Sequence, residues 1–399
     1  MQRYEDSETY HKKAIDLREN LRQSRNSLAD ISDLANSYNN LGGLYESMQR
    51  YEDSETYHKK AIDLRENLRQ SRNSLADISD LANSYNNLGN LYESMQKYED
   101  SEIYHRKAMA LYEEVKESRN SLNDISDLAR SYNNLGGLYE SMQRYEDSET
   151  YHKKAIDLRE NLRQSRNSLA DISDLARSYN NIGYLYKSMK RYEESELYYK
   201  KAIILRESLK GERNSLSDID NLVKSYSYLA TLYKSMQRYE EVEPLYKKAI
   251  ELRENLKSSR NYFSDALDLA KFCGNLGYLY KSMQRYEESE LYYKKATFIL
   301  EELKKERNSL DNNQNLAYYY IHLGSIYDSM QRYEESETFY KKGISLQKDL
   351  IKARNSLEDM EDLSTSYINL GYLYKSMKRY EESELYYKKA EDLRKSIDS

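Results

Sequence analysis

Apolar residues along this chain fall at helical spacing, in two stripes that follow one another. The first stripe begins after Ser27, and its positions are Leu28, Ile31, Leu34, Tyr38, Leu41, Tyr45 and Met48. The second stripe, which includes small residues, runs through Tyr51, Ser54, Tyr57, Ala61, Leu64 and Leu68. Steps of three and four place each stripe on one face of an α-helix. The pattern therefore predicts two helices of roughly 20 residues each, joined by a short turn at Gln49 and Arg50.

The two stripes return with a fixed period of 47 residues. Met-Gln-Arg-Tyr-Glu or a close variant begins at Met1, Met48, Met95, Met142, Met189, Met236, Met283, Met330 and Met377. A fixed period of this size indicates stacked supersecondary units. We therefore expect an all-α fold, a right-handed α-solenoid (superhelix) of helix-turn-helix repeats. Residues 1–26 would form a partial repeat with a second helix only, and residues 27–399 eight helix pairs in one continuous solenoid.

Polar residues mark the helix ends. Ser27 and Asp30 have the spacing of a capping box, in which both side chains satisfy free backbone N–H groups at a helix start. The same spacing recurs at Ser74/Asp77, Ser121/Asp124, Ser168/Asp171, Ser215/Asp218 and Ser356/Asp359. Acids at the start of the second helix and bases at its end complement the helix dipole. These signals support the predicted boundaries.

Composition narrows the function. The 68 acidic and 62 basic residues give a net charge of -6, which argues against a general nucleic-acid binder. No apolar run is long enough to span a membrane, and the first residues do not form a signal peptide. Cys273 is the only cysteine, so no disulfide framework exists and a cytoplasmic, reducing location is expected.

Histidines raise the question of a metal site, because His11, His58, His105 and His152 share the 47-residue spacing. Later repeats have tyrosine at this position. Zinc ligands must lie about 2 Å from the metal, whereas stacked helices lie about 8–10 Å apart, so we expect these histidines to pack in the core. Cys273 replaces a core tyrosine and is expected to be a buried thiol. The sequence contains no phosphate loop, nucleophile elbow or metal-ligand spacing, so we expect neither an enzyme nor a cofactor.

The repeat resembles the tetratricopeptide repeat. The resemblance rests on Tyr38-x-x-Leu41-Gly42-x-x-Tyr45, followed by Tyr51, Ser54, His58 and Ala61. Within that family, the segments 37–42 and 238–249 are similar to the long repeats of kinesin light chains and nephrocystin-type proteins. Three features depart from the family pattern: the longer period, an Arg-Asn-Ser turn in place of the usual proline, and the use of tyrosine instead of tryptophan.

The resemblance implies a peptide-binding groove lined by the polar face of the first helix, with Asn36, Asn39, Asn40, Gly43, Glu46 and Ser47 in one strip. Its lead position, the second asparagine of the Asn-Asn pair, gives the ladder asparagines Asn40, Asn87, Asn134, Asn181, Asn275 and Asn369. Tyr228 and His322 replace it in the fifth and seventh repeats. An amide donates and accepts hydrogen bonds as a peptide group does. The alternative is that these amides bond neighbouring helices or water.

Strip chemistry changes along the chain. Glu46, Glu93 and Glu140 give way to Lys187, Lys234 and Lys281 at the same position, and small residues to Tyr184 and Tyr278. The same strip gains Arg130, Arg177, Lys224 and Lys271. A ligand with acidic and aromatic residues over repeats four to six is therefore expected. The alternative is that these lysines are only solvated.

Taken together, the sequence predicts a non-enzymatic scaffold for a protein or peptide partner, without membrane or nucleic-acid contacts. Two alternatives stay open. The chain could be the sensor or regulatory segment of a larger signalling ATPase or protease. It could also assemble with itself, because the terminal helices have no evident capping repeat and their apolar faces would be open.

Overall fold

The computed structural model describes residues 2–260 and 263–397, and this part of the chain is built from α-helices without strands. In chain order they are α1 (Gln2–Arg25), α2 (Leu28–Ser47), α3 (Tyr51–Arg72), α4 (Leu75–Ser94), α5 (Tyr98–Arg119), α6 (Leu122–Ser141), α7 (Tyr145–Ser165), α8 (Leu169–Ser188), α9 (Tyr192–Arg213), α10 (Leu216–Ser235), α11 (Tyr239–Arg260), α12 (Phe263–Ser282), α13 (Tyr286–Glu306), α14 (Leu310–Ser329), α15 (Tyr333–Arg354), α16 (Leu357–Ser376) and α17 (Tyr380–Ile397). The predicted all-α repeat solenoid is confirmed, including the helix pair and its turn.

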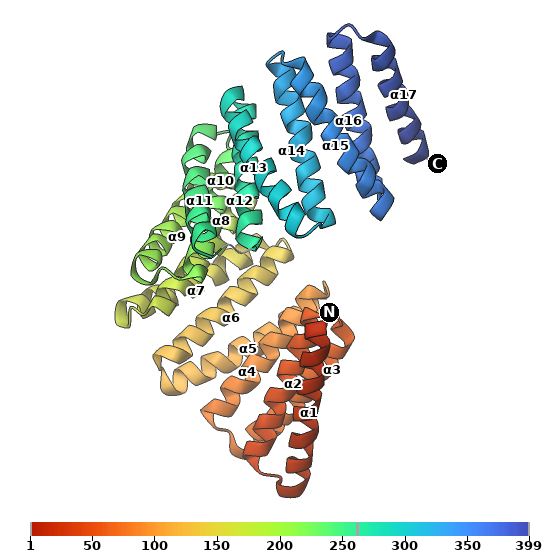
Figure 1. The fold of residues 1–399 in the computed structure, drawn as a ribbon. Coiled ribbons are helices and arrows are strands. Elements are labelled where there is room, and N and C mark those ends of the chain that lie inside the picture. Colours follow the sequence, from red (N-terminus) through yellow and green to blue (C-terminus); the bar gives the residue numbers. More distant parts are fainter. Residues whose placement is uncertain (1, 261–262, 398–399) are drawn as a thin grey trace. The chain divides into compact units, whose positions relative to one another are not determined.

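The chain forms two compact units, Met1–Ser225 and Tyr226–Ser399. Within each unit, helices that follow one another in the sequence pack together (Figure 1). First helices of successive repeats also contact each other, as α2 does α4, α4 does α6, α6 does α8, and α14 does α16. The division into a partial repeat and eight pairs of one continuous solenoid stays a prediction.

Within each unit, a clamp of tyrosine, arginine and glutamate joins helix pairs to the second helix that precedes them. The Tyr45 hydroxyl donates to Glu8 Oε1 at 2.9 Å, and Arg50 Nη1 donates to Glu8 Oε2 at 3.1 Å. The Arg50 guanidinium also lies 4.3 Å from the centre of the Tyr45 ring. The same Tyr–Arg–Glu clamp recurs around Glu102, Glu149, Glu243, Glu290 and Glu337. At Glu55 the arginine is replaced by Lys97, at 4.0 Å.

Most turns between the described helices use one residue in the left-handed region, and the turn between α13 and α14, with Arg307 extended, is an exception. Gln49, with φ of 59°, turns the chain inside the pair, and Asn73, with φ of 46°, ends the second helix. Asparagine is one of the few non-glycine residues that adopt this conformation readily. The Arg-Asn-Ser turn therefore ends the second helix by backbone geometry.

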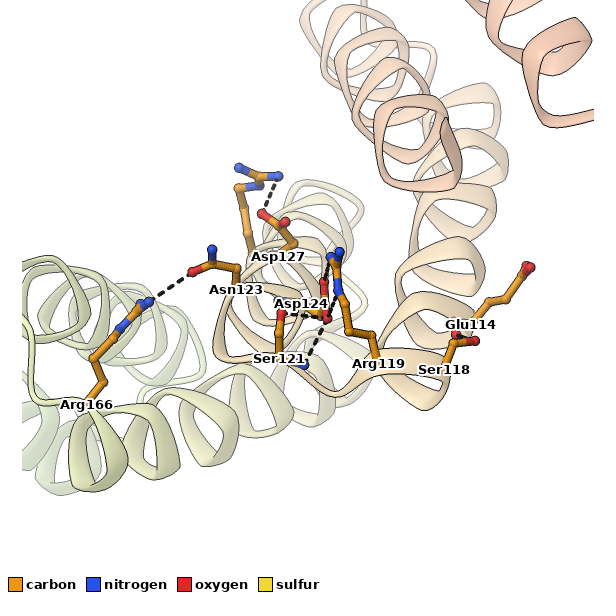
Figure 2. A network of polar contacts seen from close by, with 9 residues as sticks. Glu114, Ser118, Arg119, Ser121, Asn123, Asp124, Asp127 and Arg166 are labelled. Carbon is orange, nitrogen blue, oxygen red and sulfur yellow. Dashed lines mark hydrogen bonds and ion pairs between the residues drawn. The ribbon is translucent and has the colours of Figure 1, made fainter. Parts of the chain in front are cut away.

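The reciprocal capping box forms as predicted at Ser74/Asp77, Ser121/Asp124, Ser168/Asp171 and Ser215/Asp218, with an arginine added. At Ser27 and Ser356 only the serine side chain caps the helix, and the prediction of a full box is wrong there. Ser121 Oγ accepts a hydrogen bond from the backbone N–H of Asp124, and Asp124 Oδ2 accepts from the backbone N–H of Ser121 at 2.9 Å (Figure 2). Arg119 at the end of α5 donates through Nε to Asp124 Oδ2 at 2.9 Å and also pairs through Nη2. The bond from Arg119, together with those from Ser121, outweighs burial and lowers the pKa of Asp124 to about 2. The arginine thus ties the end of one helix to the start of the next.

Three of the four histidines pack in the core, as predicted. His58, His105 and His152 are at most 1% exposed. A Cβ atom on Gly42 would lie only 2.8 Å from the His58 ring, so glycine is what admits the ring here. Burial lowers the pKa of His58 and of its two equivalents to about 4. Cys273 is also buried, in the place of a core tyrosine.

The capping box at the start of α6 leads to a prediction about local stability. Replacing Asp124 by alanine should destabilise the start of α6 by about 1–2 kcal/mol, since the cap and its arginine bond are lost together. Hydrogen exchange of amides in the first turn of α6 measures this. The control is Glu117→Ala, because Glu117 is exposed and has no hydrogen-bond partner in the described chain. Equal exchange in the two variants would contradict the role of the cap.

The buried histidines predict acid sensitivity of the unit Met1–Ser225. The pKa of an unfolded histidine is about 6.5. Between about pH 6.5 and 4, these three histidines therefore take up protons only in the unfolded chain. Stability therefore falls as the pH decreases through this window, by up to about 3 kcal/mol per histidine, and levels off near the folded pKa. Urea unfolding of this protein at about pH 7 and about pH 4.5 measures the loss.

The matched variant carries His58→Tyr, His105→Tyr and His152→Tyr together. The chain itself places Tyr199, 1% exposed, at the equivalent position beside Asn180 and Gly183. The variant should lose much less stability between the two pH values. An equal loss in both proteins would show that other groups cause the acid sensitivity.

Candidate functional site

The six ladder asparagines have free side-chain amides. Asn40 and Asn275 are exposed, and the other four, Asn87, Asn134, Asn181 and Asn369, are half-buried. Within the described residues none of their amides forms a hydrogen bond to the protein. Four of the six lie in the unit Met1–Ser225, at equivalent positions on the neighbouring helices α2, α4, α6 and α8. We call this surface of the four helices the ladder strip.

The first asparagine of each pair does not belong to the strip, which corrects the prediction for Asn39. Asn39 is buried, its Nδ2 donates to Ser84 Oγ at 2.8 Å, and its Oδ1 lies 3.0 Å from His58 Nδ1. Asn86 and Asn133 meet His105 and His152 in the same way. A position one residue away is turned by about 100° on a helix. Asn39 therefore holds two repeats together, whereas its neighbour Asn40 faces solvent.

Acidic residues line one edge of the ladder strip. Glu46 accepts from Ser94 at 3.3 Å and Glu93 accepts from Ser141 at 3.0 Å, each on the next first helix. Glu140 Oε1 is buried without a partner in the described chain and faces a pocket of about 430 Å³ that Tyr184 also lines. Burial, with a smaller contribution from Glu93, raises the pKa of Glu140 to about 7. This carboxyl group therefore titrates near neutral pH.

The predicted basic residues divide into paired and free groups. Arg130 donates to Asn83 at 2.8 Å and pairs with Asp127 at 3.0 Å, and Arg177 pairs with Asp174 at 3.4 Å. Arg130 thus links α6 to α4, whereas Arg177 is paired within its own helix. By contrast Lys187, Lys224 and Lys271 have no ion pair or hydrogen bond within the described residues. Their charge is therefore available to a ligand.

In the unit Tyr226–Ser399 the structure brings three predicted residues to one pocket. Lys271, Asn275 and Tyr278 on α12 line about 400 Å³ together with Tyr318 on α14. Tyr278 and Tyr318 are both 49% exposed, so aromatic surface is open to solvent there. Gly274 admits Tyr319, whose ring would lie 2.4 Å from a Cβ atom at that position.

The ladder is interrupted in this unit by His322, which the sequence already indicated. Its ring stacks on Tyr293 at 5.4 Å and meets the Tyr318 ring at 4.2 Å. Burial lowers the His322 pKa to about 3, with a smaller effect from Lys281. Lys281 Nζ donates to Ser325 at 2.9 Å, and its burial lowers the lysine pKa. Lys281 is therefore anchored, while Lys234 is half-buried and lies 5.8 Å from the Tyr246 ring.

A second pocket of about 480 Å³ adjoins this cluster, and Asn369 is the only ladder asparagine among its lining residues. Its other side chains include Asn315, Tyr318, Gln347 and Asp362. Sequence reasoning missed these residues, because none matches a known motif and because Asn315, Tyr318 and Gln347 differ from the consensus of the repeat, whereas Asp362 follows it. The departure of those three residues from the consensus was the available signal.

Within residues 2–260 and 263–397, no three histidine, cysteine or acidic side chains gather as ligands for a metal ion. Over the same part of the chain, no helix has the length and apolar character needed to cross a membrane.

The stacked helix pairs and their unpaired polar strip define a helical-repeat scaffold. A family model described as tetratricopeptide repeat matches residues 33–114, 80–161, 127–208 and 174–255. A second model with the same description matches 270–297, 317–350 and 364–397. These matches cover more than half of the chain, which therefore belongs to the tetratricopeptide-repeat family. Repeats of this family generally form non-enzymatic scaffolds that bind proteins.

Solved structures with a similar fold have low sequence identity. BtubC from P. vanneervenii is 20% identical with a TM-score of 0.47, covering 64% of this chain and 92% of its own. The nuclear import adaptor Nro1 of S. pombe is 14% identical with a TM-score of 0.49, covering 73% and 100%. A Rap protein in complex with competence and sporulation factor is 16% identical with a TM-score of 0.37, covering 92% and 99%. The comparison with curated proteins finds no match.

Proposed function

We propose that this chain binds an extended peptide or protein segment along the ladder strip. The observation that carries the proposal is the contrast within each Asn-Asn pair. Asn39 is buried and satisfied by His58 and Ser84, whereas Asn40 keeps a free amide on the adjacent surface. The same contrast returns at Asn86 and Asn87. In these repeats the first asparagine is thus engaged in the core, while the second is left available to a ligand.

Repetition suits the ladder to an extended segment. Neighbouring helix axes lie about 8–10 Å apart, and an extended chain advances about 3.3 Å per residue. Successive ladder amides would therefore meet about every third residue of the ligand. A side-chain amide both donates and accepts hydrogen bonds, as a peptide group does. It can therefore bind the backbone of a ligand whatever side chain the ligand has at that residue. Specificity would come from the free lysines and from Tyr184, which favour an acidic and aromatic ligand.

A cytoplasmic location fits this proposal, because a chain with one cysteine, the buried Cys273, builds no disulfide framework of its own. Self-association is the second candidate. On α1, the side chains of Tyr4, Tyr10, Leu17 and Leu21 are 46%, 72%, 67% and 38% exposed. Light scattering that shows a monomer at all concentrations would remove this candidate. The role of a regulatory segment in a larger signalling protein stays a third possibility.

The ladder is tested with a random peptide library displayed on phage. Peptides selected on this protein should bind at least about tenfold more weakly to a variant with Asn87→Ala, Asn134→Ala and Asn181→Ala, since several amide bonds of about 0.5–1.5 kcal/mol each are lost. Affinity is measured by calorimetry and helicity by circular dichroism. The matched control is Asn67→Ala with Asn161→Ala, because these are exposed asparagines of the second helices α3 and α7. Unchanged affinity in the ladder variant would refute the groove.

A further inference from the structure

A buried arginine recurs on the second helices of this chain and shows how the fold holds a guanidinium group. Arg65, Arg159, Arg206 and Arg253 stand at the same position of four repeats and are 3–5% exposed. Arg159 Nη1 donates to the carbonyl of Asp174 at 3.1 Å and to Ser178 Oγ, both on the following first helix. The receiving groups thus come from the next repeat.

Acidic side chains take part in the same arrangement. Arg253 Nη2 lies 3.1 Å from Asp268, and its Nη1 lies 3.6 Å from Asp265. Asp268 is the equivalent of Asp174 in the next-but-one repeat, by two periods of 47 residues. The acceptors on the following first helix are thus the Asp174 carbonyl and Ser178 in one repeat. In the other they are the carboxylates of Asp265 and Asp268, with Phe272 at the serine position.

Three repeats have another residue at the position of this arginine. They differ in whether the acceptor groups on the following first helix are retained. At Tyr112 the guanidinium of Arg130 takes the place, donating to the Tyr112 hydroxyl at 3.2 Å. At Leu300 the acceptors are lost as well. The positions that hold aspartate, aspartate and serine in other repeats are here Asn312, Asn315 and Tyr319. At Gln347 the receiving groups are intact, and they are Asp359, Asp362 and Ser366.

Gln347 lines a pocket that contains hydrogen-bond acceptors but no basic side chain. Gln347 is 8% exposed, and its Oε1 is buried with no hydrogen-bond partner in the described chain. The 480 Å³ pocket that it lines also contains Asp359, Asp362 and Ser366, and its lining includes no lysine or arginine. Such a volume is within the range of about 300–1,000 Å³ typical of ligand pockets.

Neighbouring cations neutralise little of the negative charge that Asp359 and Asp362 bring to this pocket. Arg354 lies 3.6 Å from Asp359 and donates to Gln314 at 3.3 Å, so it partly serves one of the two aspartates. Asp362 has no ion pair in the described chain, and burial together with nearby carboxylates raises its pKa. Tyr318 adds an aromatic wall, and a guanidinium stacks well on such a ring.

We propose that this pocket binds the guanidinium group of an arginine side chain from the partner segment, at the place where other repeats insert an arginine of their own. The inference deepens the proposed function, because it names one residue of the ligand. It lies within the unit Tyr226–Ser399, whereas the ladder experiment addresses the unit Met1–Ser225. The two proposals can therefore fail separately.

The test titrates the full chain with N-acetyl-arginine methylamide, which represents an arginine residue within a peptide. Saturable binding at one site is expected by calorimetry or NMR, together with at least tenfold weaker binding of the neutral citrulline analogue. Free arginine should bind no more tightly than the methylamide. Tighter binding of the free amino acid, or equal binding of the citrulline analogue, would overturn the assignment.

Two variants locate the binding. Gln347→Arg restores the internal arginine, so it should abolish binding of the probe while keeping or raising the thermal midpoint of unfolding. Asp362→Asn should weaken binding several-fold, whereas the matched Asp174→Asn, at a site that Arg159 already fills, should leave it unchanged. Undiminished binding in both Gln347→Arg and Asp362→Asn would overturn the proposal, and should Gln347→Arg fail to fold, Asp362→Asn decides alone.

Discussion

The Tyr–Arg–Glu clamp is the interaction on which the stacking of this chain depends. A single helix pair cannot bury its apolar face alone, and its neighbours must cover it in a fixed register. Apolar contacts are not directional, so they do not fix that register by themselves. The clamp does, because one carboxylate such as Glu102 receives both the Tyr139 hydroxyl and the Arg144 guanidinium. Burial alone would raise the Glu102 pKa, but these bonds outweigh it and the pKa falls below its usual value. The carboxylate thus stays charged, and charge-assisted bonds are the stronger ones.

The period of 47 residues was enough to predict the helices, their turns and their caps, because these depend on local spacing. The same information placed His58 in the core and excluded a zinc site. It did not separate Asn39 from Asn40, because the groups that make Asn39 structural lie 19 and 45 residues further along the chain. A signal was nevertheless present. From the fifth repeat on, the first asparagine becomes Ser227, Gly274, Ile321 and Ile368 while tyrosine stands in place of the histidine.

Charge was harder to interpret from the sequence than spacing. Arg130 and Arg177 were grouped with the strip lysines, but both are paired with aspartates of their own helix. Glutamates of the strip are half-buried, and Glu140 has lost the hydroxyl partner that Glu46 and Glu93 have. A count of charges along a helix face cannot show such pairing, since it depends on side-chain reach across repeats. The buried-arginine position was missed for the same reason: it belongs to the second helix, whereas its acceptors belong to the next repeat.

Specificity is a difference in affinity between ligands, and backbone-reading amides contribute little to it. The two pockets of the unit Tyr226–Ser399 are better placed to discriminate. They share Tyr318 and Asn315, and they have opposite charge, with Lys271 in one and Asp362 in the other. A ligand that placed an acid in the first and an arginine in the second would satisfy both, whereas the reversed order would set like charges against each other. In the proposed complex, adjoining pockets of opposite charge would fix the direction of a bound segment, which a ladder of identical amides would not.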